Sequence, residues 1–200
     1  MTSPDRARWR DIAVAGHSGD VVVARNALTD ADPVARELAL GAALRLGVLS
    51  DDDLRAALVD YDASVRRRAA MLAGQRHGIS LRDTLDDVDV TVVEAAAWAC
   101  GEQQLVDDDV LAALIHLGVS ASDALVREAS AAALGAIGDP RGLPTILHAC
   151  TDKPAVRRRA VLALAPFEGD DVDAALHAAL VDRDWQVRQA AEDVLRAMND

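Results

Sequence analysis

The chain reads DALVREASAAALGAIG at residues 123–138, and this pattern recurs along most of its length. Each copy has a polar first residue, Val or Ala at the fourth position, Arg or Val at the fifth, and then a run of small apolar residues. The copies occupy residues 32–47, 62–77, 89–104, 123–138, 153–168 and 184–199. Their fifth positions are 27 to 34 residues apart. A period near 30 residues with two helices per unit predicts a stacked α-solenoid.

Shorter amphipathic stretches separate these copies and supply the second helix of each unit. Most open with Asp or Ser, which cap helices well, and glycines expected to end helices fall at 47, 78, 118, 138 and 169. The stretches are residues 51–60, 80–87, 107–118, 139–150 and 170–182. Residues 5–16 and 19–30 resemble a degenerate first pair. We therefore expect about thirteen helices, six pairs plus a final one, in a single repeat domain of residues 1–200.

The repeated segments resemble the HEAT-like repeat named after phycobilisome lyases. Its usual pattern, Asp-Pro-x-Val-Arg-x-x-Ala-Ala-x-Ala-Leu-Gly, is similar to DPVARELALGAALRLG at 32–47 and to residues 123–138. The resemblance covers nearly the whole chain and implies an all-α, right-handed solenoid of helical hairpins. For function it implies less, because such repeats serve as scaffolds, lyase subunits, enzymes and nucleic-acid binders.

The composition is acidic and helix-rich. The 200 residues are 51% hydrophobic and only 2% aromatic, with a formal net charge of −12. A chain this acidic is repelled by nucleic acid and by anionic membranes unless it segregates a basic patch. Cys100 and Cys150 lie in apolar helical patterns and form no disulfide framework. With no signal-peptide core and no run of 18 apolar residues, we expect a cytoplasmic protein.

The first arginine of each copy falls at the border of the expected core. At about 100° per residue, with the preceding apolar residue at 0°, this arginine lies near 100° and the next two positions near 200° and 300°. Arg66, Arg67 and Arg68 therefore radiate in different directions. Because a cation one turn into a helix opposes the helix dipole, the border arginine should have a fixed partner. We expect a structural ladder between repeats, with contact to a ligand as the alternative. The ladder arginines are Arg36, Arg66, Arg127, Arg157 and Arg188, and the nearest candidate partners are Asp32, Asp62, Asp89, Asp123 and Asp184.

The side of these helices opposite the core is the candidate binding stripe, since such faces stack into a concave surface in repeat proteins. An acidic centre that bears a tryptophan lies between two arginine pairs, and Trp and Arg are enriched at protein interfaces. A protein or peptide partner is therefore favoured over nucleic acid, which needs a continuous basic track. The alternative is that the tryptophan fills space and the arginines are solvated. The candidate partner-binding residues are Arg67, Arg68, Met71, Glu94, Trp98, Glu102, Glu128, Arg158 and Arg159.

Motifs for catalysis are absent from the sequence. It contains no CxxC, HExxH, GxSxG or P-loop pattern. His116 and His177 occupy equivalent places two repeats apart, roughly 20 Å at ordinary helix spacing, so they cannot share a metal ion. His-Glu pairs are also absent, which makes the iron-binding HEAT-repeat hydroxylases a poor match. The acidic runs at 51–53 and 107–109 are explained by helix capping.

The sequence thus favours a non-catalytic scaffold or adaptor that binds another protein or peptide on its concave face, with no cofactor and no metal. One alternative, implied by the resemblance, is a lyase-like or chaperone-like subunit that acts on a cofactor-bearing protein. Nucleic-acid binding is a weaker alternative because of the charge, and no membrane contact is expected. Neither the partner nor the oligomeric state follows from the sequence.

Overall fold

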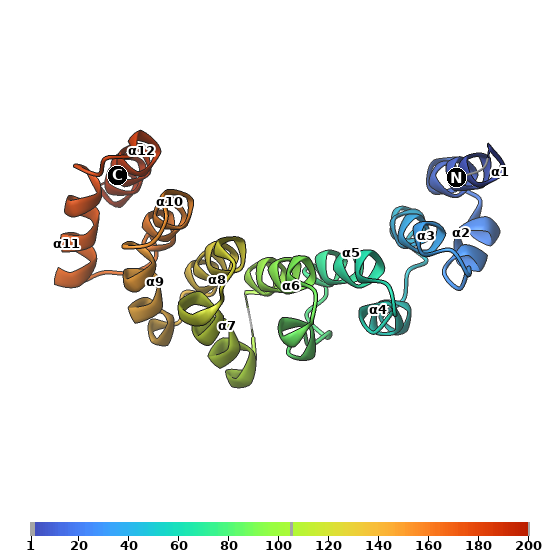
Figure 1. The fold of residues 1–200 in the computed structure, drawn as a ribbon, viewed down its shortest axis with the longest axis horizontal. Helices are drawn as coiled ribbons and strands as arrows, with labels where there is room; N and C mark the ends of the chain where they lie inside the picture. Colours follow the sequence, from blue (N-terminus) through green and yellow to red (C-terminus); the bar gives the residue numbers. More distant parts are fainter. Residues whose placement is uncertain (1–2, 105, 200) are drawn as a thin grey trace. The chain divides into compact units, whose positions relative to one another are not determined.

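Helices form wherever the sequence carries the repeated segments (Figure 1). The computed structural model describes residues 3–104 and 106–199. Its internal contacts group the chain into two compact units, Met1–Ile79 and Ser80–Asp200. The single domain over residues 1–200 stays a prediction. The described residues form α-helices and short 3₁₀ helices and no strand, so the fold class is an all-α solenoid of helical repeats, as expected.

The first unit contains two helical hairpins and one further helix. The longer helices pack on one another in sequence order, α1 on α3 and α3 on α5, and each shorter helix packs on a longer neighbour. The hairpin at the amino end confirms the expected degenerate first pair. The helices are α1 (Ser3–Ser18), α2 (Val21–Ala27), α3 (Pro33–Arg45), α4 (Asp51–Leu58) and α5 (Ala63–Ala73).

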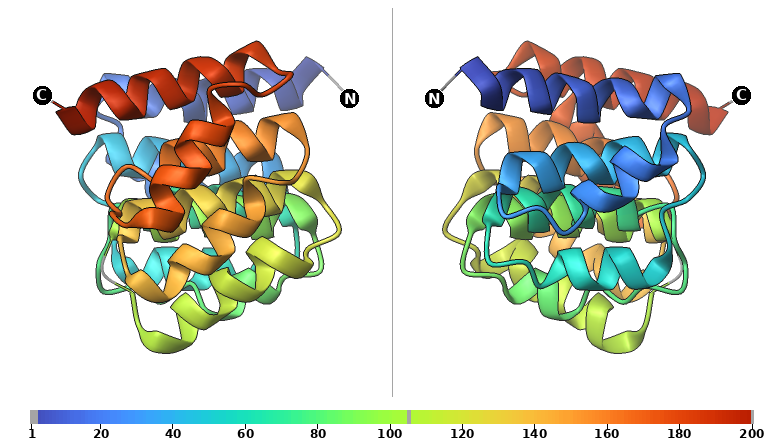
Figure 2. Two further views of the ribbon diagram at one scale, coloured as in Figure 1. Left: turned by 90° about the vertical axis from the view of Figure 1, so that its left-hand side faces the viewer. Right: turned by 90° about the vertical axis from the view of Figure 1, so that its right-hand side faces the viewer.

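The second unit continues the same plan. Here α6, α8, α10 and α12 form one row and α7, α9 and α11 form the other (Figure 1). At the carboxyl end α11 crosses α12 obliquely (Figure 2, left). The elements are η1 (Asp83–Asp86), α6 (Val90–Gln103), α7 (Asp108–Ser120), α8 (Ala124–Ile137), η2 (Pro140–Gly142), α9 (Leu143–Ala149), α10 (Pro154–Ala163), α11 (Asp170–Ala179) and α12 (Trp185–Asn199).

The small residues of the repeat bring successive long helices into close contact. At Gly135 in α8, an added Cβ would lie 2.7 Å from the Ala163 Cα atom of α10. Gly101 of α6 and Ala133 of α8 meet in the same way, with an added Cβ 2.9 Å from the Ala133 Cα atom. Since van der Waals contact gains energy only at close range, glycine and alanine at these positions give each long helix a broad, tightly packed face.

The segment at residues 80–87 departs from the expected helix. Only the 3₁₀ helix η1 forms there. This repeat is the shortest of the array, with 27 residues between the fifth positions of its two segments. The stretch between α5 and α6 is nevertheless as long as that between α8 and α10, which holds α9, so chain length does not prevent a helix here. Asp86 and Asp87 at the carboxyl end of the segment would oppose the dipole of a longer helix. If η1 is counted as the partner of α5, the described residues form the expected six pairs plus a final helix.

Gly118 is a second departure from the sequence prediction, which placed it between helices. It lies inside α7 and is buried. A Cβ at this position would lie 2.5 Å from the Thr145 Cγ2 atom of α9. Gly118 therefore permits the close approach of α7 and α9 instead of ending a helix. Gly138, by contrast, ends α8 in the left-handed conformation with φ 71°, as expected of a helix-terminal glycine.

Candidate functional site

Three of the predicted ladder arginines bind an aspartate in the loop before the next long helix. In the first unit, Arg36 donates from Nε and Nη2 to the two carboxylate oxygens of Asp60, both at 2.7 Å. In the second unit, Arg127 binds Asp152 at 2.6 and 2.9 Å. Arg157 binds Asp182 in the same way, at 2.9 and 2.7 Å. These are the two-point contacts that a planar guanidinium makes best with a carboxylate.

The partner aspartates are not those named from the sequence. Asp62 and its equivalents are occupied in helix capping: Asp62 accepts from the Ser64 N–H, and Asp123 accepts from the Leu125 N–H. The arginine instead reaches the carboxylate just before the capping residue. That carboxylate also accepts from a backbone N–H at the cap, as Asp60 does from Asp62 at 2.9 Å. One loop aspartate thus joins the preceding repeat to the helix that follows.

The ladder arginines also fasten the loop in front of their own helix. Each donates from Nη1 to a carbonyl oxygen five or six residues earlier. For Arg66 the acceptor is the Asp60 carbonyl at 2.9 Å, and for Arg188 it is the Asp182 carbonyl at 2.7 Å. Arg36, Arg127 and Arg157 make the equivalent bond. The geometry gives these side chains a scaffold role at the joints between repeats.

The ion pairs are reflected in the acidity of the aspartates. Hydrogen bonds from Arg127 and Arg157 lower the pKa of Asp152 and Asp182 below the ordinary value. Burial raises the pKa of Asp60, but the hydrogen bonds from Arg36 and from the Asp62 N–H outweigh burial, and the net shift is downward. All three carboxylates are therefore charged at neutral pH and hold their arginines in place.

The predicted stripe residues of the first unit are largely engaged with the neighbouring helix. Arg67 of α5 forms an ion pair of 3.9 Å with Glu37 of α3. Arg68 lies against Gly41, where its Nη2 atom would be 3.1 Å from an added Cβ. An Arg45 nitrogen lies 3.8 Å from the same point. Met71 is exposed on α5. Two guanidinium groups therefore cover the α3 surface at Gly41.

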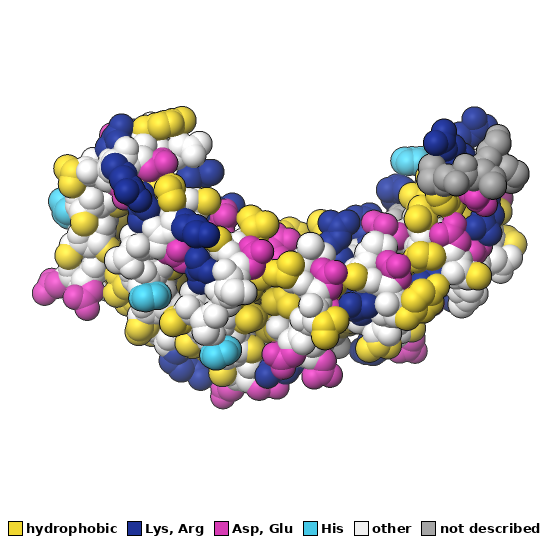
Figure 3. Space-filling model, in the orientation of Figure 1, with side chains coloured by type: hydrophobic (Ala, Val, Ile, Leu, Met, Phe, Trp, Pro, Cys, Tyr) yellow, Lys and Arg dark blue, Asp and Glu magenta, His cyan; other side chains and the backbone are white. Residues whose placement is uncertain are grey.

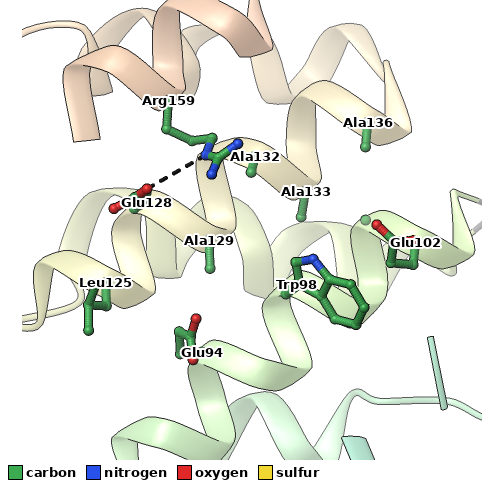
Figure 4. Close-up of a pocket in the computed structure, with 11 residues that line it drawn as sticks. Glu94, Trp98, Glu102, Leu125, Glu128, Ala129, Ala132, Ala133, Ala136 and Arg159 are labelled. Atoms are coloured by element: carbon green, nitrogen blue, oxygen red, sulfur yellow. Dashed lines mark ion pairs between the residues drawn. The ribbon is translucent and has the colours of Figure 1, made fainter. Parts of the chain in front are cut away.

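Five of the predicted stripe residues in the second unit line one hollow of about 270 Å³ (Figure 4). Glu94, Trp98 and Glu102 are four residues apart along α6, so they lie on one side of the helix. Glu128 comes from α8 and Arg159 from α10, and the Arg159 Nε atom lies 3.6 Å from a Glu128 carboxylate oxygen. The spacing in the sequence thus identified a set of side chains that the fold brings together.

Small side chains of α8 form the floor of this hollow: Ala129, Ala132, Ala133 and Ala136. They are too short to cover the indole ring opposite them, so Trp98 stays 41% exposed. In Figure 4 the ring lies between Glu94 and Glu102 and beside the alanines. An aromatic face, an apolar floor and carboxylates thus surround one small space.

Two shallower hollows extend this one toward α12. The first, of about 510 Å³, shares Ala132, Ala136 and Arg159 with it and adds Leu162 and Pro166 of the α10 region. The second, of about 240 Å³, shares Leu162 and lies between Arg158 of α10 and Trp185 of α12. We call the three together the furrow. In the space-filling view, apolar side chains alternate with charges of both signs over α8 and α10 (Figure 3).

Trp185 was missed as a site residue by the sequence prediction. It is 65% exposed and lines the furrow next to Arg158. A signal was present, because Trp185 stands two residues before the core residue Val187, roughly 160° from the core direction at about 100° per residue. Leu125, also exposed, lines the first hollow and stands just outside the stripe. The stripe predicted from the sequence begins at the arginine position and therefore leaves out both residues.

Neither cysteine is among the residues that line the furrow. Burial raises the pKa of Cys100 to about 12 and that of Cys150 to about 11, so both thiols are protonated at neutral pH. Within residues 3–104 and 106–199, no three His, Cys, Asp or Glu side chains are grouped so that they could hold a metal ion. In the same residues, no helix combines the length and the apolar character needed to cross a membrane.

Helical hairpins that stack on their neighbours in sequence order define the class of α-solenoid repeat proteins. The family model for HEAT repeats matches residues 80–165 and 111–196, more than half of the chain. The chain therefore belongs to the HEAT-repeat family.

Two solved structures have a similar fold. An engineered protein determined by a structural genomics consortium is 19% identical, with a TM-score of 0.61 over 94% of this chain and 96% of its own. Human deoxyhypusine hydroxylase, in complex with glycerol, is 20% identical, with a TM-score of 0.50 over 96% of this chain and 79% of its own. At these identities the likeness concerns the fold alone. No curated protein matches the sequence.

Proposed function

We propose that this chain is a non-catalytic interaction protein that binds a partner protein or peptide in the furrow of its second unit. HEAT repeats generally mediate protein interactions. The observation that carries the proposal is the furrow itself, because it exposes two tryptophans, Trp98 and Trp185, beside apolar hollows. A large apolar ring left in water at the edge of a hollow gains free energy when a partner covers it.

The charges of the furrow favour a protein over nucleic acid. Glu94, Glu102 and Glu128 line its α6 end, and the last of these is paired with Arg159. Carboxylates along the track would repel a phosphate backbone, whereas protein surfaces carry charges of both signs. The net charge of −12 acts in the same direction.

A matched pair of bulky substitutions tests the furrow. Ala136 is exposed on α8 and lines two of the three hollows, so Ala136→Trp should fill the site. Ala112 is exposed on α7, in the other row of helices, and Ala112→Trp places the same side chain away from the furrow. In pulldowns from a cell extract, Ala136→Trp should lose the bound partner, and Ala112→Trp should retain it.

Melting temperatures measured beside the pulldowns exclude unfolding as the cause of any loss. If Ala136→Trp keeps every partner that wild type binds, the partner does not occupy the furrow. If wild type itself retains no protein, the interaction role is wrong.

A further inference from the structure

The hollow between α6 and α8 combines carboxylates, an exposed aromatic ring and a floor of small apolar side chains. Of its three carboxylates, Glu128 is paired with Arg159. Within the described residues, Glu94 and Glu102 form no ion pair or hydrogen bond through their side chains. Two carboxylates of the hollow therefore have no cation in contact with them in the described chain. They lie on either side of the exposed Trp98 ring (Figure 4).

An aromatic ring next to carboxylates attracts a cation through two separate effects. The face of an indole ring is negative, and tryptophan is the best of the aromatic side chains for cation–π contact. The carboxylates add direct attraction and accept hydrogen bonds from an ammonium or guanidinium group. An anionic ligand would meet repulsion from the same groups, and a purely apolar one would leave Glu94 and Glu102 beside an uncharged surface.

The size and floor of the hollow restrict the ligand further. Its volume of about 270 Å³ is at or below the lower end of the ~300–1,000 Å³ found for sites that hold drug-sized molecules. It therefore suits one long side chain. The alanine floor of α8 offers apolar contact to an alkyl stem, as lysine and arginine stems require when their charged ends stay near water.

We propose that this hollow binds a lysine or arginine side chain of the partner segment. Its stem would lie on Ala132 and Ala133, and its charge would lie at Trp98 between Glu94 and Glu102. This inference rests on the proposed function, since the side chain belongs to a protein bound in the furrow. The adjoining hollow, lined by Leu162 and Pro166, would take an apolar residue that follows the basic one.

Selection from a displayed library of random peptides tests the inference without knowledge of the partner. Peptides retained by the wild-type chain, and released by the Ala136→Trp variant, should be enriched in Lys or Arg at one fixed position. Synthetic copies with that residue replaced by norleucine should bind about tenfold more weakly, because they lose one cation–π contact and two partly exposed ion pairs.

Charge variants test whether Glu94 and Glu102 cause the preference for a basic residue. Glu94→Gln/Glu102→Gln should weaken the basic peptide about tenfold and leave the norleucine peptide unchanged. Asp171→Asn/Asp173→Asn, a pair of exposed positions on α11, removes the same charge outside the furrow and should have little effect. The reversal Glu94→Arg/Glu102→Arg should shift the selected residue from Lys or Arg to Asp or Glu.

The possible results distinguish a failure of the cationic site from a failure of the proposed function. Furrow-dependent peptides without a basic position, or unaltered affinity in the glutamine variant, overturn the cationic site and leave the proposed function intact. If no peptide depends on the furrow, both proposals fail.

Discussion

Helices α5 and α10 share the sequence Val-Arg-Arg-Arg-Ala, yet their third arginines lie against different surfaces. In the first unit, Arg68 of α5 lies over Gly41, and Arg45 lies beside it. In the second unit, Arg159 of α10 turns toward Glu128 at 3.6 Å and lines an open hollow. The positions on the preceding helix differ: α3 carries Gly41 and Arg45 where α8 carries Ala132 and Ala136.

One motif thus serves two purposes within each copy. In both α5 and α10 its first arginine donates to a carbonyl of the loop before its own helix. Its second and third arginines meet whatever the neighbouring helix supplies. Arginines cover the α3 surface, whereas alanines leave the α8 surface open. The difference between the units therefore comes from the facing helix and not from the motif.

The largest effect is expected on the free energy of unfolding, in which substitutions of the first and second arginines of the motif should differ. Arg157 is 6% exposed and holds Asp182 through two hydrogen bonds. Arg157→Ala should lower the free energy of unfolding by about 3 kcal/mol, because it leaves a partly buried carboxylate without its partner. Arg158→Ala, one position on and exposed, should change it by less than about 0.5 kcal/mol. Urea denaturation at pH 7 measures both.

The pH dependence of stability tests whether Arg157 acts through Asp182. The pKa of Asp182 is lowered from 3.8 in the folded chain, with the hydrogen bond from Arg157 as the largest cause. The stabilisation is therefore complete above about pH 4 and is lost as the pH falls through the lowered pKa. Wild type should lose more stability over that acid range than Arg157→Ala. Parallel pH curves for the two proteins would show that Arg157 does not act through Asp182.

A smaller effect is expected where the long helices meet in the second unit. In Gly135→Ala, the new Cβ would lie 2.6 Å from the Ala163 Cβ atom and 2.7 Å from the Ala163 Cα atom. Because backbone cannot move aside easily, the substitution should destabilise the protein by about 2 kcal/mol. Gly78→Ala is the control, since its nearest neighbour is Asp51 Oδ2 at 3.9 Å. A neutral Gly135→Ala would mean that α8 and α10 separate without cost.

The smallest expected effect has the opposite sign and concerns the α3 surface that Arg68 covers. In Gly41→Ala, the nearest atom to the new Cβ is Arg68 Nη2 at 3.1 Å, the end of a flexible side chain that can swing away. The gain in helix propensity should then dominate and stabilise the protein by up to about 1 kcal/mol. Thermal melting detects the change. A loss of stability would show that Arg68 is held firmly over α3.

The repeats could be predicted from the sequence, because the period near 30 residues and the apolar positions of each long helix can be recognised from the order of neighbouring residues alone. The sequence did not predict that residues 80–87 form only the 3₁₀ helix η1, nor that Gly118 lies inside α7, where its role depends on Thr145 of another helix. Side-chain partners were also missed, since Asp60 and Asp62 are two residues apart and only the fold decides which one Arg36 reaches.

The candidate site could likewise be predicted only in part from the sequence. Glu94, Trp98 and Glu102 share one side of a helix by spacing alone, so their grouping could be predicted. The hollow could not, because it depends on the short side chains of α8 and on the turn of Arg159 toward Glu128. Trp185 joins the furrow only through the packing of α12 against α10.

The loops that join the repeats have a consequence for how such a chain can grow. Asp-x-Asp occurs at residues 30–32, 60–62, 87–89 and 182–184, and in each the second aspartate donates its N–H to the carboxylate of the first. At 60–62 and 182–184 the first aspartate binds an arginine of the preceding repeat. Three consecutive residues thus carry both the carboxylate that binds the preceding repeat and the carboxylate that caps the following helix. A duplicated gene segment that carries one hairpin with this loop brings its own connection to either neighbour, so repeats can be added or removed without new contacts having to arise elsewhere.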